Sequence, residues 1–168
     1  MAHRLKPITP TGVAGALAKA ERYRLLNDPE GAESICLDVL EIEPDNQQAL
    51  VMLLLSRTDQ IEYTLGTGVG KAREVLPRLT TEYDREYYAG LICERRGQAQ
   101  LRSTTIGATI AAYDWFVEAM ECYERAERLR KQGNDDALLR WNACARALNA
   151  HPEVHPRPQQ RYEPILGE

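Results

Sequence analysis

The residues from Val13 to Asn46 predict two amphipathic helices joined by a short turn. They read V-A-G-A-L-A-K-A-E-R-Y-R-L-L-N-D-P-E-G-A-E-S-I-C-L-D-V-L-E-I-E-P-D-N. Small and apolar residues recur at the three- and four-residue spacing of one helix face. Asp28 followed by Pro29 marks the start of the second helix, because Asp caps free N–H groups and Pro lacks one. Such a pair cannot bury its own apolar face, so it has to stack on further helices.

The spacing of these residues resembles one complete tetratricopeptide unit, a helix-turn-helix repeat of about 34 residues. The residues that fill its small, medium, aromatic and closing positions are Ala20, Tyr23, Ala32, Cys36, Val39 and Pro44. The resemblance implies an all-α fold, namely a short right-handed superhelix of about three helix pairs with a C-terminal capping helix.

Helical patterns continue through most of the remaining chain, and no run alternates with the period of a strand. The helices are expected over about 11–27, 29–42, 47–63, 69–79, 82–101, 111–131 and 135–148. Pro77 should kink or shorten the fourth helix, because proline removes a backbone hydrogen bond. The stretch L-G-T-G-V-G (65–70) lacks the preceding strand and the G-K-[ST] ending of a phosphate-binding loop, so it is expected to be a flexible hinge.

These patterns divide the chain into three parts. Residues 1–10 are expected to form a flexible N-terminus, and residues 11–150 the tetratricopeptide-like helical domain. Residues 151–168 are expected to form an extended, proline-rich tail without a core of its own. The last helix, which carries Leu138 and Trp141 on its apolar stripe, is expected to cap the exposed end of the array.

Composition restricts the class of protein. The 168 residues fit one domain, and a formal charge of −4 with a pI near 5.5 argues against nucleic-acid binding. No segment approaches the roughly 20 apolar residues needed to cross a bilayer, and no apolar run near the N-terminus indicates a secretory signal. We therefore expect a cytoplasmic protein without a membrane partner.

The four cysteines lie far apart without a C-x-x-C pair, so each is expected to act as a small core residue.

Catalytic, metal-binding and cofactor-binding patterns have little support. All three histidines fall in the expected flexible ends, where a general base is poorly held. The segment Asn134-Asp135-Asp136 lacks the further oxygen ligands of a calcium loop, and capping of the following helix explains it. We therefore expect no catalytic residue, no metal site and no cofactor.

The resemblance implies that the first helix of each pair lines a concave groove for a peptide or helix of a partner protein. Carried over to the matching positions, the groove residues are Leu17, Glu21, Arg24, Val51, Leu55, Thr58, Asp59, Tyr87, Leu91, Glu94 and Arg95. Some members of the family clamp a terminal carboxylate with Lys and Asn, but Leu17, Glu21 and Met52 stand at those positions here. The predicted groove is instead apolar with charges of both signs, and it suits an amphipathic partner.

The resemblance thus favours a protein-interaction module, an adaptor or a chaperone. Two alternatives remain open: a structural protein that forms a homodimer through the same helix faces, and a small-ligand binder or enzyme with a pocket between the fourth and sixth helices, around Glu94 and Arg95. Tyr83, Tyr87 and Tyr88, with their charged neighbours, are either a peptide-contact patch or interhelical packing.

Overall fold

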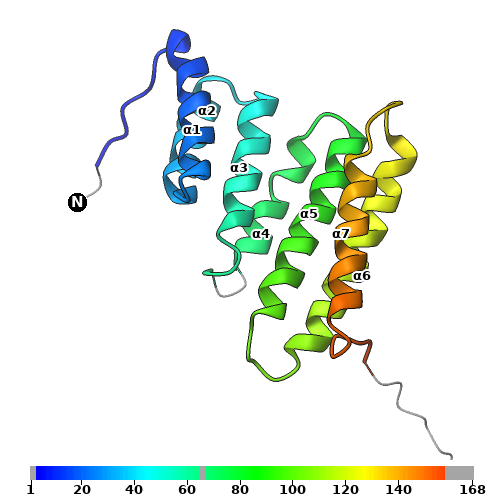
Figure 1. Cartoon of the computed structure of the whole chain (residues 1–168). Helices are drawn as coiled ribbons and strands as arrows, with labels where there is room; N and C mark the ends of the chain where they lie inside the picture. The colour runs from blue at the N-terminus through cyan, green and yellow to red at the C-terminus, as the bar shows by residue number, and fades with distance from the viewer. Residues whose placement is uncertain (1–2, 65–66, 158–168) are drawn as a thin grey trace, which may run out of the picture.

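The computed structural model describes residues 3–64 and 67–157, and this part of the chain contains helices and no strand (Figure 1). In chain order, with η for a 3-10 helix, the elements are η1 (Pro10–Gly12), α1 (Val13–Leu25), α2 (Pro29–Ile42), α3 (Gln47–Asp59), α4 (Thr67–Arg73), η2 (Leu76–Arg78), α5 (Glu82–Leu101), α6 (Ala108–Leu129) and α7 (Asp136–Ala150). The expected all-α class is therefore confirmed. None of the described helices is long and apolar enough to pass through a bilayer.

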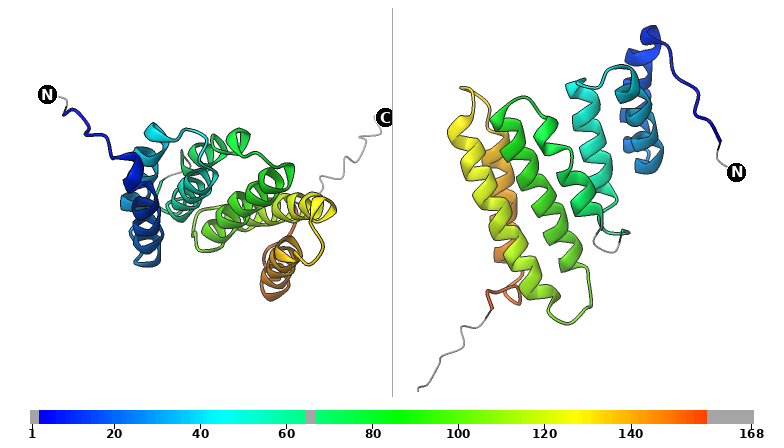
Figure 2. Two further views of the ribbon diagram at one scale, coloured as in Figure 1. Left: turned by 90° about the horizontal axis from the view of Figure 1, so that it is seen from above. Right: turned by 180° about the vertical axis from the view of Figure 1, so that it is seen from behind.

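The helices lie side by side in one row, with α1 and α7 toward opposite ends (Figures 1 and 2). Each helix packs against the next along the chain, and α1, α3, α5 and α7 also contact one another in that order. Alternate helices therefore share one side of the row, where side chains from α1, α3 and α5 can meet.

Side-chain hydrogen bonds cap the starts of α2 and α3, and the cap of α2 is the one that the sequence predicts. Asp28 accepts a hydrogen bond of 2.9 Å from the backbone N–H of Gly31 at the start of α2, and Asn46 caps α3 in the same way. Each of these two caps contributes about 1 kcal/mol to helix stability. Ahead of α7, Asn134 accepts a hydrogen bond of 3.0 Å from the backbone N–H of Asp136, whereas the N-cap residue Asp135 makes no side-chain cap.

Two clusters of buried side chains form the core. The first joins α1, α2, α3 and α4, and Leu50 and Leu53 of α3 lie inside it. The second joins α5, α6 and α7 around Phe116 and Tyr123. Trp115 of α6 packs against both clusters and so connects the two halves of the row. Burial between neighbours on both sides explains why α3 is apolar around most of its surface.

The glycine-rich stretch is the start of a helix rather than a hinge over its described residues. Thr67 is the first residue of α4, and residues 65 and 66 lie outside the described part. A Cβ on Gly68 would lie 3.1 Å from the Cα of Ile61, so the glycine allows α4 to pack directly against the turn after α3. α4 then ends at Arg73, ahead of the proline that the sequence predicts to shorten it.

The last helix and the start of the expected tail pack onto the second cluster. α7 buries Ala137 and Cys144, and Trp141 of the expected apolar stripe packs against the second cluster. Leu138 of that stripe is instead 36% exposed, and the adjacent Ala137 takes the buried position. Val154 is also buried in this cluster, so the first residues after α7 are not free of the core. Residues 158–168 of the expected tail lie outside the described part.

Candidate functional site

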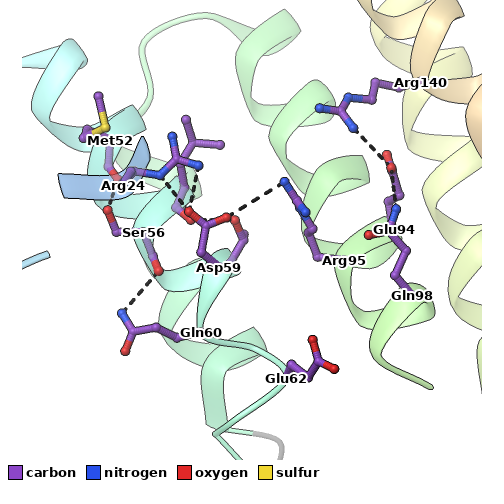
Figure 3. Close-up of polar contacts among 12 residues, drawn as sticks. Arg24, Met52, Ser56, Asp59, Gln60, Glu62, Glu94, Arg95, Gln98 and Arg140 are labelled. Atoms are coloured by element: carbon purple, nitrogen blue, oxygen red, sulfur yellow. Dashed lines mark hydrogen bonds and ion pairs between the residues drawn. The ribbon is translucent and has the colours of Figure 1, made fainter. Parts of the chain in front are cut away.

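The carboxylate of Asp59, the last residue of α3, lies between two arginines from neighbouring helices (Figure 3). Arg24 of α1 donates from Nε to Oδ2 of Asp59 at 2.8 Å, and its Nη2 lies 2.8 Å from the same oxygen. On the other side, Nη2 of Arg95 on α5 is 3.9 Å from Oδ1 of Asp59. The contact with Arg24 is a charge-assisted hydrogen bond. The contact with Arg95 is a loose ion pair, longer than a hydrogen bond.

A second ion pair lies beside the first, at the C-terminal end of α5, and both pairs line one cavity. Arg102 donates from Nε and Nη2 to the two carboxylate oxygens of Glu62, each at 2.9 Å. This hydrogen bonding holds the pKa of the Glu62 carboxyl below its usual value. The cavity has a volume of about 310 Å³. We call it the Asp59 pocket and define it by Arg24, Thr58, Asp59, Glu62, Arg95 and Arg102.

The Asp59 pocket carries a surplus of positive charge in an acidic chain. Three guanidinium groups face two carboxylates in the pocket, whereas the whole chain has a formal charge of −4. Arg95 also has unused hydrogen-bonding capacity at its guanidinium, since the side chain is 37% exposed and its Nη2 approaches Asp59 only to 3.9 Å. A guanidinium offers five N–H donors in a planar fork that matches a carboxylate or a phosphate. The pocket therefore suits an anionic group placed against Arg95.

Helical geometry explains why these side chains meet. Arg24 and Asp59 both lie in the last turns of their helices, and the C-termini of these two helices lie on the same edge of the row (Figure 1). Arg95 and Arg102 are seven residues apart, about two helical turns, so both fall on one side of α5. The hydroxyl of Thr58 donates to a backbone carbonyl one turn earlier at 2.7 Å, which leaves the polar contacts of the pocket to the charged groups.

The pocket brings together only part of the predicted groove. The predicted residues that line it are Arg24, Thr58, Asp59 and Arg95. Leu17 is buried and Glu21 is exposed, and both line a separate hollow between α1 and the start of α3. Val51 and Leu55 are half-buried on α3. The eleven predicted positions therefore do not form one continuous cavity within the described part of the chain.

Glu94 is directed away from the Asp59 pocket, toward α6 and α7 (Figure 3). It is 2% exposed and accepts hydrogen bonds from the Tyr123 hydroxyl at 2.7 Å, Gln98 at 3.1 Å and Arg140 at 3.2 Å. Burial, reinforced by the negative charge of Glu94, raises the pKa of Tyr123. Glu94 thus ties α5 to α6 and α7. Because the adjacent Arg95 points to Asp59 instead, these two residues do not share a pocket.

The tyrosine cluster on α5 packs between helices. The Tyr87 ring centroid is 5.9 Å from that of Tyr83, 5.1 Å from that of Tyr88 and 5.9 Å from that of Tyr123 on α6. Leu91, one turn after Tyr87, is 2% exposed. These contacts favour interhelical packing over a peptide-contact patch for Tyr87 and Leu91.

Two features of the structure were not predicted from the sequence, namely two residues of the Asp59 pocket and a pair of cysteines. Glu62 and Arg102 complete the Asp59 pocket from positions beyond the regular ends of α3 and α5, where helical spacing gives no signal. Cys93 of α5 and Cys122 of α6 share a cavity of about 520 Å³ between η2, α5 and α6. The sequence does predict two long amphipathic helices with a short connection between them. Such helices pack as an antiparallel hairpin, which brings residues before the connection close to residues after it, and this could have indicated the pair.

No protein family, curated protein or solved structure among those compared matches this chain.

Proposed function

We propose that the chain is a tetratricopeptide-like protein-binding module, which holds an acidic amphipathic segment of a partner protein at the Asp59 pocket. One observation carries the proposal: two arginines share Asp59, but only Arg24 binds it closely. Arg95 therefore keeps donors available beside an open cavity of about 310 Å³. An acidic side chain of the partner matches both the charge and the forked geometry of this guanidinium.

The packing of the first two helices supports the repeat part of the proposal. Ala20 and Ala32, at the small positions of the repeat pattern, have no exposed surface, and Cys36 and Val39 are fully buried beside them. α3 packs on both α1 and α2, as one unit stacks on the next in a helical array. The side shared by α1, α3, α5 and α7 is where such an array receives its partner.

In the proposed complex, the partner's carboxylate becomes the close counterion of Arg95. The 3.9 Å contact of Arg95 with Asp59 is given up at little cost, because Arg24 continues to neutralise Asp59. Val51 and Leu55 precede Asp59 at four-residue intervals, so the three residues follow one stripe of α3. The two half-buried apolar side chains receive the apolar face of the partner segment.

Fluorescence anisotropy with a synthetic amphipathic peptide tests this function. The probe carries glutamates on its polar face, and a control peptide of equal length carries glutamines there. We expect the glutamate peptide to bind at least about tenfold more tightly, which corresponds to about 1.4 kcal/mol. Arg95→Gln should remove most of this difference. Arg146→Gln changes an exposed arginine of α7 outside the pocket and should bind like the unmodified chain.

Two results would contradict the proposal. One is equal affinity for the glutamate and glutamine peptides. The other is an Arg95→Gln variant that keeps its helical circular-dichroism spectrum and still prefers the glutamate peptide to the original extent.

A further inference from the structure

Two cysteine side chains meet in the cavity between η2, α5 and α6. Cys93 and Cys122 come from adjacent antiparallel helices, and both line the same cavity, where each thiol shifts the pKa of the other. Their side chains are only 1% and 4% exposed, but both line the open cavity of about 520 Å³. Cys122 is the more exposed of the two, so a small solute in this cavity meets Cys122 first. Cys36 and Cys144 are buried elsewhere in the two core clusters.

Each thiol of this pair is contacted by an arginine. Arg125 donates from Nη2 to Sγ of Cys122 at 3.1 Å, and Arg73 donates from Nη2 to Sγ of Cys93 at 3.6 Å. Glutamates hold both guanidinium groups in place. Arg125 pairs with Glu86 at 2.8 Å. Positive groups beside sulfur favour the thiolate, which is the nucleophilic form of cysteine.

Arg73 is fixed by two further contacts. Its Nη2 lies 2.8 Å from Oε1 of Glu118, and its guanidinium carbon lies 5.4 Å from the centroid of the Trp115 ring. The arginine therefore keeps its place over Cys93 without depending on the weak bond to sulfur. The two cysteines are thus set between two arginine–glutamate pairs.

The two thiols are not equivalent. The neighbouring Cys93 thiol lowers the pKa of Cys122, and the charge of Arg125 lowers it further. The neighbouring Cys122 thiol, together with burial, raises the pKa of Cys93. In contrast, burial raises the pKa of Cys36 to about 11 and that of Cys144 to about 12. Cys122 is therefore the cysteine that ionises first.

We propose that Cys93 and Cys122 form a redox-active dithiol site, in which hydrogen peroxide attacks at Cys122 and the product is a Cys93–Cys122 disulfide. In the first step the Cys122 thiolate attacks one peroxide oxygen. The S–O bond forms, the O–O bond breaks, and the departing hydroxide takes a proton to leave as water. Sulfur is oxidised to the sulfenic acid and peroxide is reduced.

In the second step the sulfur of Cys93 attacks the sulfenic sulfur of Cys122. The S–S bond forms, the S–O bond breaks, and the leaving hydroxide combines with the Cys93 proton as a second water. Over both steps two thiols lose two protons and two electrons, and one peroxide takes them up to become two waters. A dithiol reductant reverses the reaction by thiol–disulfide exchange.

Mass spectrometry of the full chain tests the dithiol site. The unmodified protein is treated with a small excess of hydrogen peroxide, unfolded, and alkylated at its remaining thiols. We expect a loss of two hydrogens in the intact mass, two alkylated cysteines that map to Cys36 and Cys144, and one cross-linked peptide joining Cys93 to Cys122. Oxidation of Cys36 or Cys144 at the same rate, or sulfinic acid at Cys122 without a disulfide, would overturn the proposal.

Variants then test the roles of the individual groups. Cys93→Ser should leave the Cys122 sulfenic acid unresolved, so that a dimedone label appears on Cys122. Arg125→Gln should slow the reaction of Cys122 with peroxide roughly tenfold for each unit by which its pKa rises, while Arg125→Lys should retain most of the rate. A rate that is the same in Arg125→Gln and Arg125→Lys contradicts the role of Arg125. Where a variant loses its helical spectrum, the peptide map of the unmodified chain still decides the proposal.

Discussion

The aromatic ring of Tyr123 lies directly against the backbone of Gly90. A Cβ built on Gly90 would be 2.7 Å from a ring carbon of Tyr123, closer than real side-chain contacts. The missing side chain lets α5 and α6 approach each other, and Tyr123 then reaches Glu94, one turn further along α5, with its hydroxyl. Close approach and the buried hydrogen bond therefore depend on the same contact between the two helices.

Gly90→Ala should destabilise the protein, although alanine is the better helix former. The gain in helix propensity is up to about 1 kcal/mol, while overpacking against a ring with no exposed surface costs about 1–3 kcal/mol. We expect a net loss of about 1 kcal/mol in the free energy of unfolding, measured by urea denaturation. Gly70→Ala in α4 is the matched control, because a Cβ there meets nothing within 4 Å. A Gly90→Ala variant that is stabilised as much as Gly70→Ala contradicts the packing argument.

Tyr123→Phe should leave the Glu94 carboxylate with an unmet hydrogen bond in the core. The Tyr123 hydroxyl donates to Oε2 of Glu94 at 2.7 Å, and the carboxylate is 2% exposed. Loss of a partner from a buried acceptor costs about 1–3 kcal/mol. Chemical denaturation should show this loss for Tyr123→Phe and almost none for Tyr63→Phe, because Tyr63 is 77% exposed. Equal stability of the two variants would show that Glu94 finds another donor.

Arg57 joins three helices, so its loss should loosen α4 in particular. From α3 it donates to Oε1 of Glu33 on α2 at 2.9 Å and to the carbonyl of Lys71 on α4 at 2.6 Å. Arg57→Met keeps much of the apolar stem but removes both bonds, and we expect a loss of about 1–3 kcal/mol. Hydrogen exchange in α4 should become faster while exchange in α6 stays unchanged. Arg102→Met is the control, since its exposed pair with Glu62 contributes no more than about 1 kcal/mol; uniform acceleration along the chain would contradict the local role.

Local signals were sufficient to predict most of the helices. Asp28 caps α2 from the position that the sequence indicates, because capping depends on residues within one turn. The prediction of a hinge at Gly68 is wrong, because glycine occurs both in flexible hinges and where two helices pack closely. Only the approach of Ile61, which the local sequence does not reveal, distinguishes the two.

The candidate sites depend on which residues of each helix face its neighbours. The sequence specifies this orientation less well than it specifies the positions of the helices. An error of one residue rotates a helix position by about 100°. On α7 this error separates the predicted Leu138 from the buried Ala137. The same geometry separates Arg95, which faces Asp59, from Glu94, which faces Arg140. A helix-spacing argument places both α5 residues in one groove, whereas their contacts assign them to opposite sides.

Alkaline pH should destabilise the protein through the buried thiol of Cys36. Burial, followed by the charge of Glu33, raises the pKa of Cys36 from its ordinary value of 9.0 to about 11 in the folded chain. Between these two values the unfolded chain loses the thiol proton and the folded chain keeps it. The stabilisation is therefore fully present below pH 9 and is lost as the pH rises toward 11.

Cys36→Ala removes this titration, so its stability relative to the unmodified protein should depend on pH. At about pH 10.5 the advantage of the unmodified chain should have fallen by about 2 kcal/mol from its value at neutral pH. Urea denaturation of both proteins at the two pH values measures the change. Ser34→Ala, an exposed position on the same helix, should keep a constant difference. A Cys36→Ala difference that is equally constant with pH would mean that the thiol is ionised in the folded protein no later than in the unfolded chain.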